Sequence, residues 1–434
     1  MTVTPCPRTH AAEASSTARE WLLCGMLLLA TLLNYADRQT LPMTAVKVKS
    51  ELGLSNRQYG QIEGRFGLAF GCGGLLFGVL ADVISVRWLY PTVMLVWSCA
   101  GVATGWAEGF AFLWISRVAL GLFEAGHWPC ALRTTQRVFT PRQRTLANSI
   151  LQSGAPLGAI LTSALVLWLM TEAAGTWRPV FWYTGVLGVP WVVLWFLTAR
   201  ASDFHRPVSQ TVDPSQGGEA QMVEVPLLET FLSRRYLLLV VVILCINTTW
   251  HYIRVWLPLA LEENLHYTQS QVQQFFILYW IATFFGSMAC GGLTSRLVSA
   301  GWHVQRARLG AFFGFSLLTA LTTVAAFLPA GKLFLTLMLL VGFGSLGLFP
   351  IYYSLNQELS AKNQGKVGGS LGFLTWSVLS IVHPAVGWTL DNLPGTRPYV
   401  FATMGLLPLV AWCAIALFWG ERPKANGPEG APAR

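Results

Sequence analysis

Residues 21–41 read WLLCGMLLLATLLNYADRQTL, an apolar run that is long enough to cross a bilayer as one helix. Near its end, a carboxylate and a guanidinium lie side by side at Asp37 and Arg38. Each charge costs on the order of 3 kcal/mol at the centre of a membrane helix. Membrane proteins tolerate such charges where a water-filled cavity or the interior of a helix bundle receives them. The stretch therefore predicts a membrane helix with a polar binding face.

Five residues of this region share one helix face because they are three or four positions apart: Thr31, Asn34, Tyr35, Arg38 and Pro42. Asp37 lies about 100° around the helix from Arg38 and is expected to point to a neighbouring helix. An alternative is that the charged pair anchors the helix end by reaching to the lipid headgroups. We prefer the binding face, because the pair lies within an otherwise apolar run.

The composition predicts a helical protein that crosses the membrane several times. Of its 434 residues, 53% are hydrophobic and only 11% are charged, and the mean hydropathy is +0.50. The apolar runs are continuous rather than alternating, which excludes a membrane β-barrel. The net charge of +9 does not indicate a nucleic-acid partner, because the basic residues lie in short segments between apolar runs. All eight cysteines except Cys6 lie in apolar runs without a CxxC pair, which argues against disulfides or a metal site.

Twelve membrane-spanning helices are predicted, at about 20–42, 58–81, 88–107, 110–133, 145–170, 178–199, 236–260, 271–294, 306–328, 332–354, 366–389 and 396–419. The one long polar segment, 200–235, is rich in Ser, Gln, Pro, Gly and Glu and predicts a flexible linker. The expected division is a tail at 1–19, a six-helix half at 20–199, the linker at 200–235, a second six-helix half at 236–419 and a tail at 420–434.

The distribution of basic residues predicts that both termini and the linker are cytoplasmic. With the N-terminus inside, most Lys and Arg residues lie in inner segments, among them Arg133, Arg137, Arg142, Arg144, Arg296, Arg306 and Arg308. Lys47, Lys49 and Arg57 lie in an outer segment and weaken the bias without reversing it. We expect a multi-pass protein of the inner (plasma) membrane, with the lipid bilayer as its permanent partner.

An internal repeat supports the division into two halves. The first span contains Tyr35-x-x-Arg38-x-x-x-Pro42, and the seventh contains His251-x-x-Arg254-x-x-x-Pro258. Arginine and proline therefore recur at the same spacing and at the equivalent place of each half. Two halves related in this way would place Arg38 and Arg254 on opposite sides of one central cavity.

Four motifs of this chain resemble those of a known transporter family. They are Asn34-Tyr35-Ala36-Asp37-Arg38-Gln39, Gly78-Val79-Leu80-Ala81-Asp82 followed by Arg87, Arg117-Val118-Ala119-Leu120-Gly121-Leu122-Phe123-Glu124-Ala125-Gly126, and Trp256-Leu257-Pro258. Together they resemble the major facilitator superfamily and, within it, the hexuronate-transporter-like branch of the anion:cation symporter family. The resemblance extends from about Trp21 to Trp419, apart from the linker.

The resemblance implies twelve membrane helices in two pseudo-symmetric six-helix halves. It also implies symport of an organic anion, such as a hexuronate or an aldonate, with protons or sodium ions by alternating access. In such a protein Arg38 would bind the substrate carboxylate, Asp37 and Glu124 would carry the coupling proton, and Arg117 would pair with the acids. The cytoplasmic gate between the halves would include Gly78, Asp82 and Arg87.

The chain departs from the family pattern in four places. Phe70 and Gly74 stand where the family has tyrosine and glutamine. Gly64-Arg65-Phe66 stands where the family has serine, alanine and phenylalanine, and Ser295 replaces the aspartate of the second gate motif. His251 and Arg254 stand where the hexuronate branch is apolar. The substrate could therefore differ from hexuronate.

Other candidate substrate-binding residues are Tyr35, Gln152, Trp250, His251, Arg254 and Asn356. Gln152 is polar within an apolar run and is a candidate hydrogen-bond donor to substrate. Trp250 could wall the cavity or simply pack, His251 could be an interior histidine with a satisfied partner, and Asn356 could face the cytoplasm.

Several charged residues leave two interpretations open. Arg117 and Glu124 share a helix face about 10 Å apart, so they could form a structural salt bridge to the first span or a proton-coupling switch. Glu63 and Arg65 could be charges at the rim of the second span or could line the cavity. His127, one turn after Glu124, could relay or modulate its proton.

Three alternative functions differ in the features that they require. A phosphate-ester:phosphate antiporter would use Arg38 and Arg254 as a clamp, but it need not have the acids Asp37 and Glu124. A non-transporting membrane sensor is disfavoured because neither the linker nor the tails resemble an output domain. An enzyme is disfavoured because no nucleophile with an adjacent base, metal-ligand spacing or phosphate loop is present. We expect the protein to use no cofactor and to be a monomer. We expect the coupling ion to be H⁺ rather than Na⁺, because the sequence shows no oxygen-rich cation cage.

Overall fold

The computed structural model describes residues 8–139, 141–171, 173–204, 227–359, 364–393 and 395–419. These form twelve long helical units, three of which are divided into two helices. In the N-terminal half they are α1 (Arg8–Leu52), α2 (Asn56–Val83), α3 (Val86–Thr104), α4 (Phe110–Glu124) with α5 (His127–Val138), α6 (Pro141–Leu169), and α7 (Arg178–Val186) with α8 (Gly188–Thr198). In the C-terminal half they are α10 (Arg234–Leu259), α11 (Gln269–Ser299), α12 (Val304–Ala325), α13 (Lys332–Gly347) with α14 (Phe349–Gln357), α15 (Gln364–Asn392) and α16 (Arg397–Phe418). Short turns η1 (Ala201–Phe204), α9 (Leu227–Leu232) and the π-helix η2 (Ala260–Asn264) complete the described part.

The helical units coincide with the twelve predicted spans, so the predicted fold class is confirmed. Within the described residues, nine helices or joined helices are long and apolar enough to cross a membrane. The other three predicted spans correspond to α1, α3 and α4–α5, which carry charged residues inside or at their ends. The centre of the predicted linker and the C-terminal tail lie outside the described residues, so the domain boundaries stay predictions.

Matching helix starts support the internal repeat. Ser55 caps α2 by accepting a hydrogen bond from the backbone of Gln58, whose side chain returns a bond to the cap. Thr268 and Gln271 form the same reciprocal capping box at the start of α11. Each box satisfies two backbone donors that the first helical turn leaves without partners. The second span of each half therefore begins with the same capping box.

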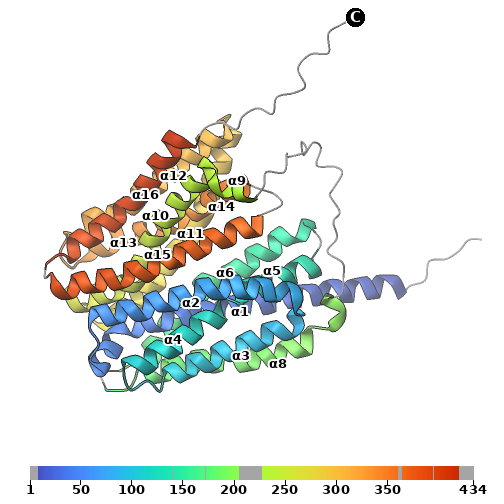
Figure 1. The fold of residues 1–434 in the computed structure, drawn as a ribbon, viewed down its shortest axis with the longest axis horizontal. Helices are drawn as coiled ribbons and strands as arrows, with labels where there is room; N and C mark the ends of the chain where they lie inside the picture. The colour runs from blue at the N-terminus through green and yellow to red at the C-terminus, as the bar shows by residue number, and fades with distance from the viewer. Residues whose placement is uncertain are drawn as a thin grey trace, which may run out of the picture.

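The two halves lie side by side in Figure 1, and their longest contact runs along α2 and α15. Glycines permit this close approach. A Cβ atom on Gly60 would lie 2.3 Å from the carbonyl oxygen of His383, and one on Gly64 would lie 2.9 Å from that of Ser380. A second contact between halves joins α6 to α11.

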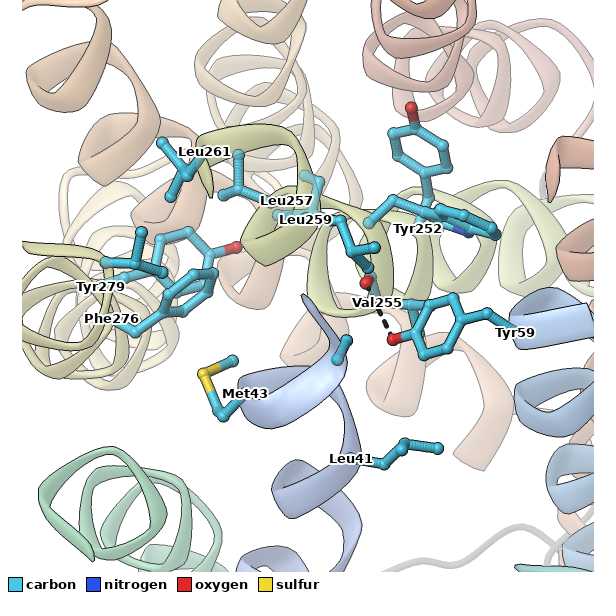
Figure 2. Packing of buried hydrophobic residues seen from close by; sticks show 14 of the residues in the cluster. Leu41, Met43, Tyr59, Tyr252, Val255, Leu257, Leu259, Leu261, Phe276 and Tyr279 are labelled. Atoms are coloured by element: carbon cyan, nitrogen blue, oxygen red, sulfur yellow. Dashed lines mark hydrogen bonds between the residues drawn. The ribbon is translucent and has the colours of Figure 1, made fainter. Parts of the chain in front are cut away.

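Polar contacts between the halves gather at the end formed by the end of α1 and the start of α2. Tyr59 Oη donates to the carbonyl oxygen of Val255 at 3.2 Å, within an apolar cluster that Figure 2 shows. Lys49 Nζ lies 2.6 Å from Glu263 Oε1 on η2. Asp391 on α15 accepts hydrogen bonds from two backbone amides in the first turn of α2. These contacts hold the two halves together at the end that is predicted to face outward.

We expect Gly158→Ala to destabilise the protein by about 2 kcal/mol, the usual range for overpacking. A Cβ atom on Gly158 of α6 would lie 2.1 Å from the carbonyl oxygen of Leu32 on α1, where only backbone movement makes room. Gly25→Ala is the matched control, because nothing lies within 4 Å of a Cβ atom there. Unfolding experiments in detergent would measure the stability of both variants. Equal stability of the two variants would contradict the close packing of α1 on α6.

Candidate functional site

Arg38 forms a buried ion pair with Glu124 that joins α1 to α4. Its Nη2 and Nε atoms lie 2.6 Å and 2.9 Å from Glu124 Oε1. Arg38 is 4% exposed and Glu124 is completely buried. Asn34 supports the pair, accepting from Arg38 Nη2 at 3.2 Å and donating to the Glu124 backbone oxygen at 3.2 Å. Arg38 therefore points into the bundle and does not reach to the headgroups.

Aromatic rings from three helices surround the Arg38 guanidinium. Its central carbon lies 4.4 Å from the ring centre of Phe70 on α2, 4.9 Å from that of Tyr35 on α1, and 5.9 Å from that of Trp376 on α15. Cations are attracted to the faces of such rings, and the planar guanidinium also stacks on them. Both halves thus contribute to the surroundings of Arg38.

Asp37 points away from Arg38 to a neighbouring helix, as its position on the helix predicts. Trp97 on α3 donates from Nε1 to Asp37 Oδ2 at 3.1 Å, and the side chain is buried. The other carboxylate oxygen has no hydrogen-bond partner among the described residues. Arg117 on α4 donates to the backbone oxygen of Asp37 at 3.4 Å rather than to its carboxylate.

Glu63 on α2 lies in the interior of the bundle, which decides between the rim and cavity positions that the sequence leaves open. It is 1% exposed. Its Oε2 atom accepts from Arg254 Nη2 on α10 at 2.9 Å, and its Oε1 atom lies 3.6 Å from Arg117 Nη2. Glu63 therefore links the two halves through a buried ion pair. Arg65, two residues further on, is exposed.

His251, which contacts Arg254, also contacts the Trp376 ring that lies near Arg38. Arg254 Nε contacts His251 Nδ1 at 3.3 Å, and the His251 ring centre lies 4.6 Å from that of Trp376. Arg254 is 3% exposed, yet its Nη1 atom has no hydrogen-bond partner in the described part of the chain. The structure thus brings the two predicted arginines, Arg38 and Arg254, to one aromatic wall.

Three predicted substrate-binding residues are not in this network. Trp250 is buried and packs edge-on against Trp280 and Phe349, with ring centres 5.6 Å and 6.3 Å away. Gln152 on α6 is exposed. Asn356 on α14 is buried, and its Oδ1 atom has no partner among the described residues. A substrate role for these three residues stays a prediction.

Two other interior histidines have partners. His127 is buried, and its ring nitrogens lie 2.7 Å from Tyr90 Oη and 3.1 Å from Thr31 Oγ1. His383 Nδ1 accepts from Trp256 Nε1 at 3.3 Å. Within the described ranges, no group of three or more His, Cys, Asp or Glu side chains is placed to hold a metal ion.

The predicted gate residues lie where α2 ends and α3 begins. Gly78 has open space where a Cβ atom would stand. Asp82 is largely exposed and forms an ion pair with Arg133 of α5, Oδ1 to Nη2, at 3.2 Å. Arg87 lies over the ring of Trp88, 5.8 Å from its centre. This end of α2 lies opposite the end where the polar contacts between the halves gather.

Comparison with known proteins gives consistent matches over nearly the whole chain. The profile of the Major Facilitator Superfamily matches residues 27–384. The hexuronate transporter of Bacillus subtilis (strain 168) is 26% identical over 419 residues, covering 94% of this chain and 96% of that protein. The probable sulfoacetate transporter of Cupriavidus necator is 27% identical over 394 residues, covering 89% and 90%. The xylose transporter of E. coli in an inward open conformation superposes with a TM-score of 0.72 at 12% identity, covering 94% and 98%, and shows the fold alone.

Proposed function

Because this chain belongs to the Major Facilitator Superfamily and is a membrane transporter rather than an enzyme, we propose that it carries an organic anion together with protons by alternating access. The observation that carries the proposal is the buried pair of Arg38 with Glu124, an anion-binding group held by a group that can take a proton. The proposed substrate class is a sugar acid such as a hexuronate or an aldonate. Both named relatives support an organic acid, since their names specify hexuronate and sulfoacetate.

The pair of Arg38 and Glu124 can couple proton and anion movement. Without substrate, the Glu124 carboxylate neutralises the guanidinium. Protonation of Glu124 removes that negative charge, and Arg38 can then bind a substrate carboxylate with its planar fork of donors. Loss of the proton restores the competing carboxylate and favours release of the substrate. Asp37, buried on the adjacent face of α1, is the proposed second proton carrier.

Alternating access requires that the contacts between the halves break and form at opposite ends of the bundle. Tyr59–Val255 and Lys49–Glu263 close the end that is predicted to face outward. We infer that these contacts open when substrate enters from outside. We also infer from the distribution of Lys and Arg that both termini are cytoplasmic, and we propose that the transporter works in the inner membrane as a monomer.

Glu124→Gln is expected to separate exchange from accumulation. In proteoliposomes with acid outside, the wild-type protein should concentrate a labelled hexuronate or aldonate, and a proton ionophore should abolish this. The variant should still exchange internal for external substrate, but it should not accumulate substrate, because residue 124 no longer takes up a proton. Arg65→Gln, a change at an exposed arginine, is the control. Accumulation by Glu124→Gln at the wild-type level would refute the coupling role.

The same assay separates this proposal from its alternatives. Accumulation driven by a sodium gradient at equal pH would identify Na⁺ as the coupling ion. Exchange of a sugar phosphate for inorganic phosphate, without transport of any sugar acid, would identify an antiporter with Arg38 and Arg254 as the clamp. In the structure both arginines already pair with carboxylates, which favours the sugar acid.

A further inference from the structure

We propose that the substrate is a diacid whose two acidic groups bind at opposite ends of the site, one at Arg38 and the other at Arg254. This inference rests on the proposed transport function and specifies its substrate class further. In the structure, Glu124 and Glu63 occupy the places that the two acidic groups of the substrate would take.

The first support is that Arg38 and Arg254, one from each half, are both buried and both paired with a carboxylate. Arg38 of α1 pairs with Glu124 at 2.6 Å, and Arg254 of α10 pairs with Glu63 at 2.9 Å. All four side chains are nearly or completely buried. Each arginine thus lies in surroundings that already accommodate a carboxylate group. A monoacid would use only one of these two places.

The second support is an unused donor at the Arg254 end. Arg254 directs Nε to His251 and Nη2 to Glu63, while Nη1 has no hydrogen-bond partner in the described residues. A buried donor without a partner is unfavourable. A substrate carboxylate at this end would satisfy Nη1.

The third support is an aromatic wall, formed by Trp376 and Phe66, that connects the surroundings of the two arginines. The Trp376 ring lies 5.9 Å from the Arg38 guanidinium and 4.6 Å from the ring of His251, which contacts Arg254. Phe66 lies beside it and contacts both Arg38 and Trp376. The two rings come from α15 and α2, so the wall belongs to both halves. A short carbon chain could lie against it with one acidic group at each arginine.

The fourth support is the charge balance of the site. Three buried arginines, Arg38, Arg117 and Arg254, lie among three buried carboxylates, Asp37, Glu63 and Glu124. A diacid would add two negative charges to this balanced set. Protonation of Glu124 and Glu63 would restore the balance and release both arginines. The diacid should therefore enter with two protons, whereas a monoacid needs only one.

The test is a comparison of gluconate with glucarate, which share a six-carbon polyol chain but carry one and two carboxylates. Binding to the purified, full-length protein would be measured by thermal shift over a concentration series. The wild-type protein should bind glucarate about 10- to 100-fold more tightly, the range for a hydrogen bond to a charged group. Equal affinity for the two acids would overturn the inference.

Two variants assign the preference to Arg254. Arg254→Gln should reduce the affinity ratio of glucarate to gluconate to about 1, whereas the exposed Arg65→Gln should leave the wild-type ratio. If Arg254→Gln does not fold, the double variant Glu63→Gln/Arg254→Gln removes both charges together and should show the same ratio of about 1. If either Arg254 variant keeps the wild-type affinity ratio of glucarate to gluconate, Arg254 only connects helices and does not bind the substrate.

The outcomes also separate this inference from the proposed function. Binding of gluconate with no preference for glucarate would overturn the diacid alone and leave a sugar-acid transporter. Failure of glucarate, gluconate and a hexuronate alike to bind would overturn both proposals. In proteoliposomes, uptake of two protons for each glucarate would support the charge balance, and uptake of one proton would contradict it.

Discussion

Arg38→Lys is expected to lower the initial rate of substrate uptake at least about 100-fold, although lysine keeps the positive charge. The structure shows two features of Arg38 that lysine lacks. Its Nε and Nη2 atoms both contact Glu124, while Nη2 also reaches Asn34. In the proposed mechanism the substrate carboxylate takes these same two donors when Glu124 is protonated. A charged hydrogen bond contributes about 1.5–3 kcal/mol, so the loss of two bonds to the substrate corresponds to a 100-fold effect or more. The Arg38 guanidinium also lies 4.4 Å from the ring centre of Phe70 and 4.9 Å from that of Tyr35, and an ammonium group interacts with such rings less well than a guanidinium.

The measurement is uptake and exchange of a sugar acid in proteoliposomes that contain equal amounts of folded protein. Arg65→Lys is the matched control, because Arg65 is an exposed arginine of α2 and should tolerate the change. Exchange should fall together with uptake in Arg38→Lys, since the loss concerns binding itself. Rates within threefold of the wild-type rates would show that Arg38 contributes only charge and that another residue orients the substrate.

The place of Arg38 could be predicted from sequence for a simple reason. A charged pair in a long apolar run has to face the inside of a bundle, and helical periodicity then determines which side chain points in which direction. The structure agrees, with Arg38 directed to Glu124 and Asp37 directed to Trp97. The twelve spans could be predicted in the same way, because each needs an apolar run of about 20 residues.

The partner of each charge could not be predicted, because partners depend on how helices far apart in sequence approach each other. The family resemblance predicts that Arg117 pairs with Asp37 and Glu124, whereas among the described residues it forms an ion pair with Glu63. A signal for Glu63 does exist in the pattern of small residues. Gly60, Gly64 and Gly67 lie on the face of α2 that packs on α15, and a carboxylate beside such a face meets another helix rather than water. In the sequence, however, Glu63 lies near the predicted start of the second span, where a charge at the membrane surface is an equally good interpretation.

Glu63→Gln is expected to destabilise the protein by about 3 kcal/mol or more. The change is nearly isosteric, but it removes the carboxylate that faces both Arg254 and Arg117. A buried ion pair adds little net stability, because desolvation offsets the attraction, but removing one partner leaves an uncompensated charge that costs about 3–5 kcal/mol. Here one substitution affects two buried guanidinium groups. Unfolding by a denaturing detergent, followed by circular dichroism as the loss of helical structure, would give the difference in unfolding free energy between the variant and the wild-type protein.

A double-mutant cycle distinguishes this charge effect from a packing effect. Glu63→Gln/Arg254→Gln removes both members of the pair, so it should be more stable than Glu63→Gln alone by about 1–2 kcal/mol, within the range measured for coupled neighbours. Glu108→Gln, at an exposed carboxylate in the loop before α4, should leave stability unchanged. If Glu63→Gln is as stable as the wild-type protein, Glu63 carries no charge in the substrate-free state. The Arg254 end would then already hold its proton before the substrate arrives, and a diacid would need only one further proton, at Glu124.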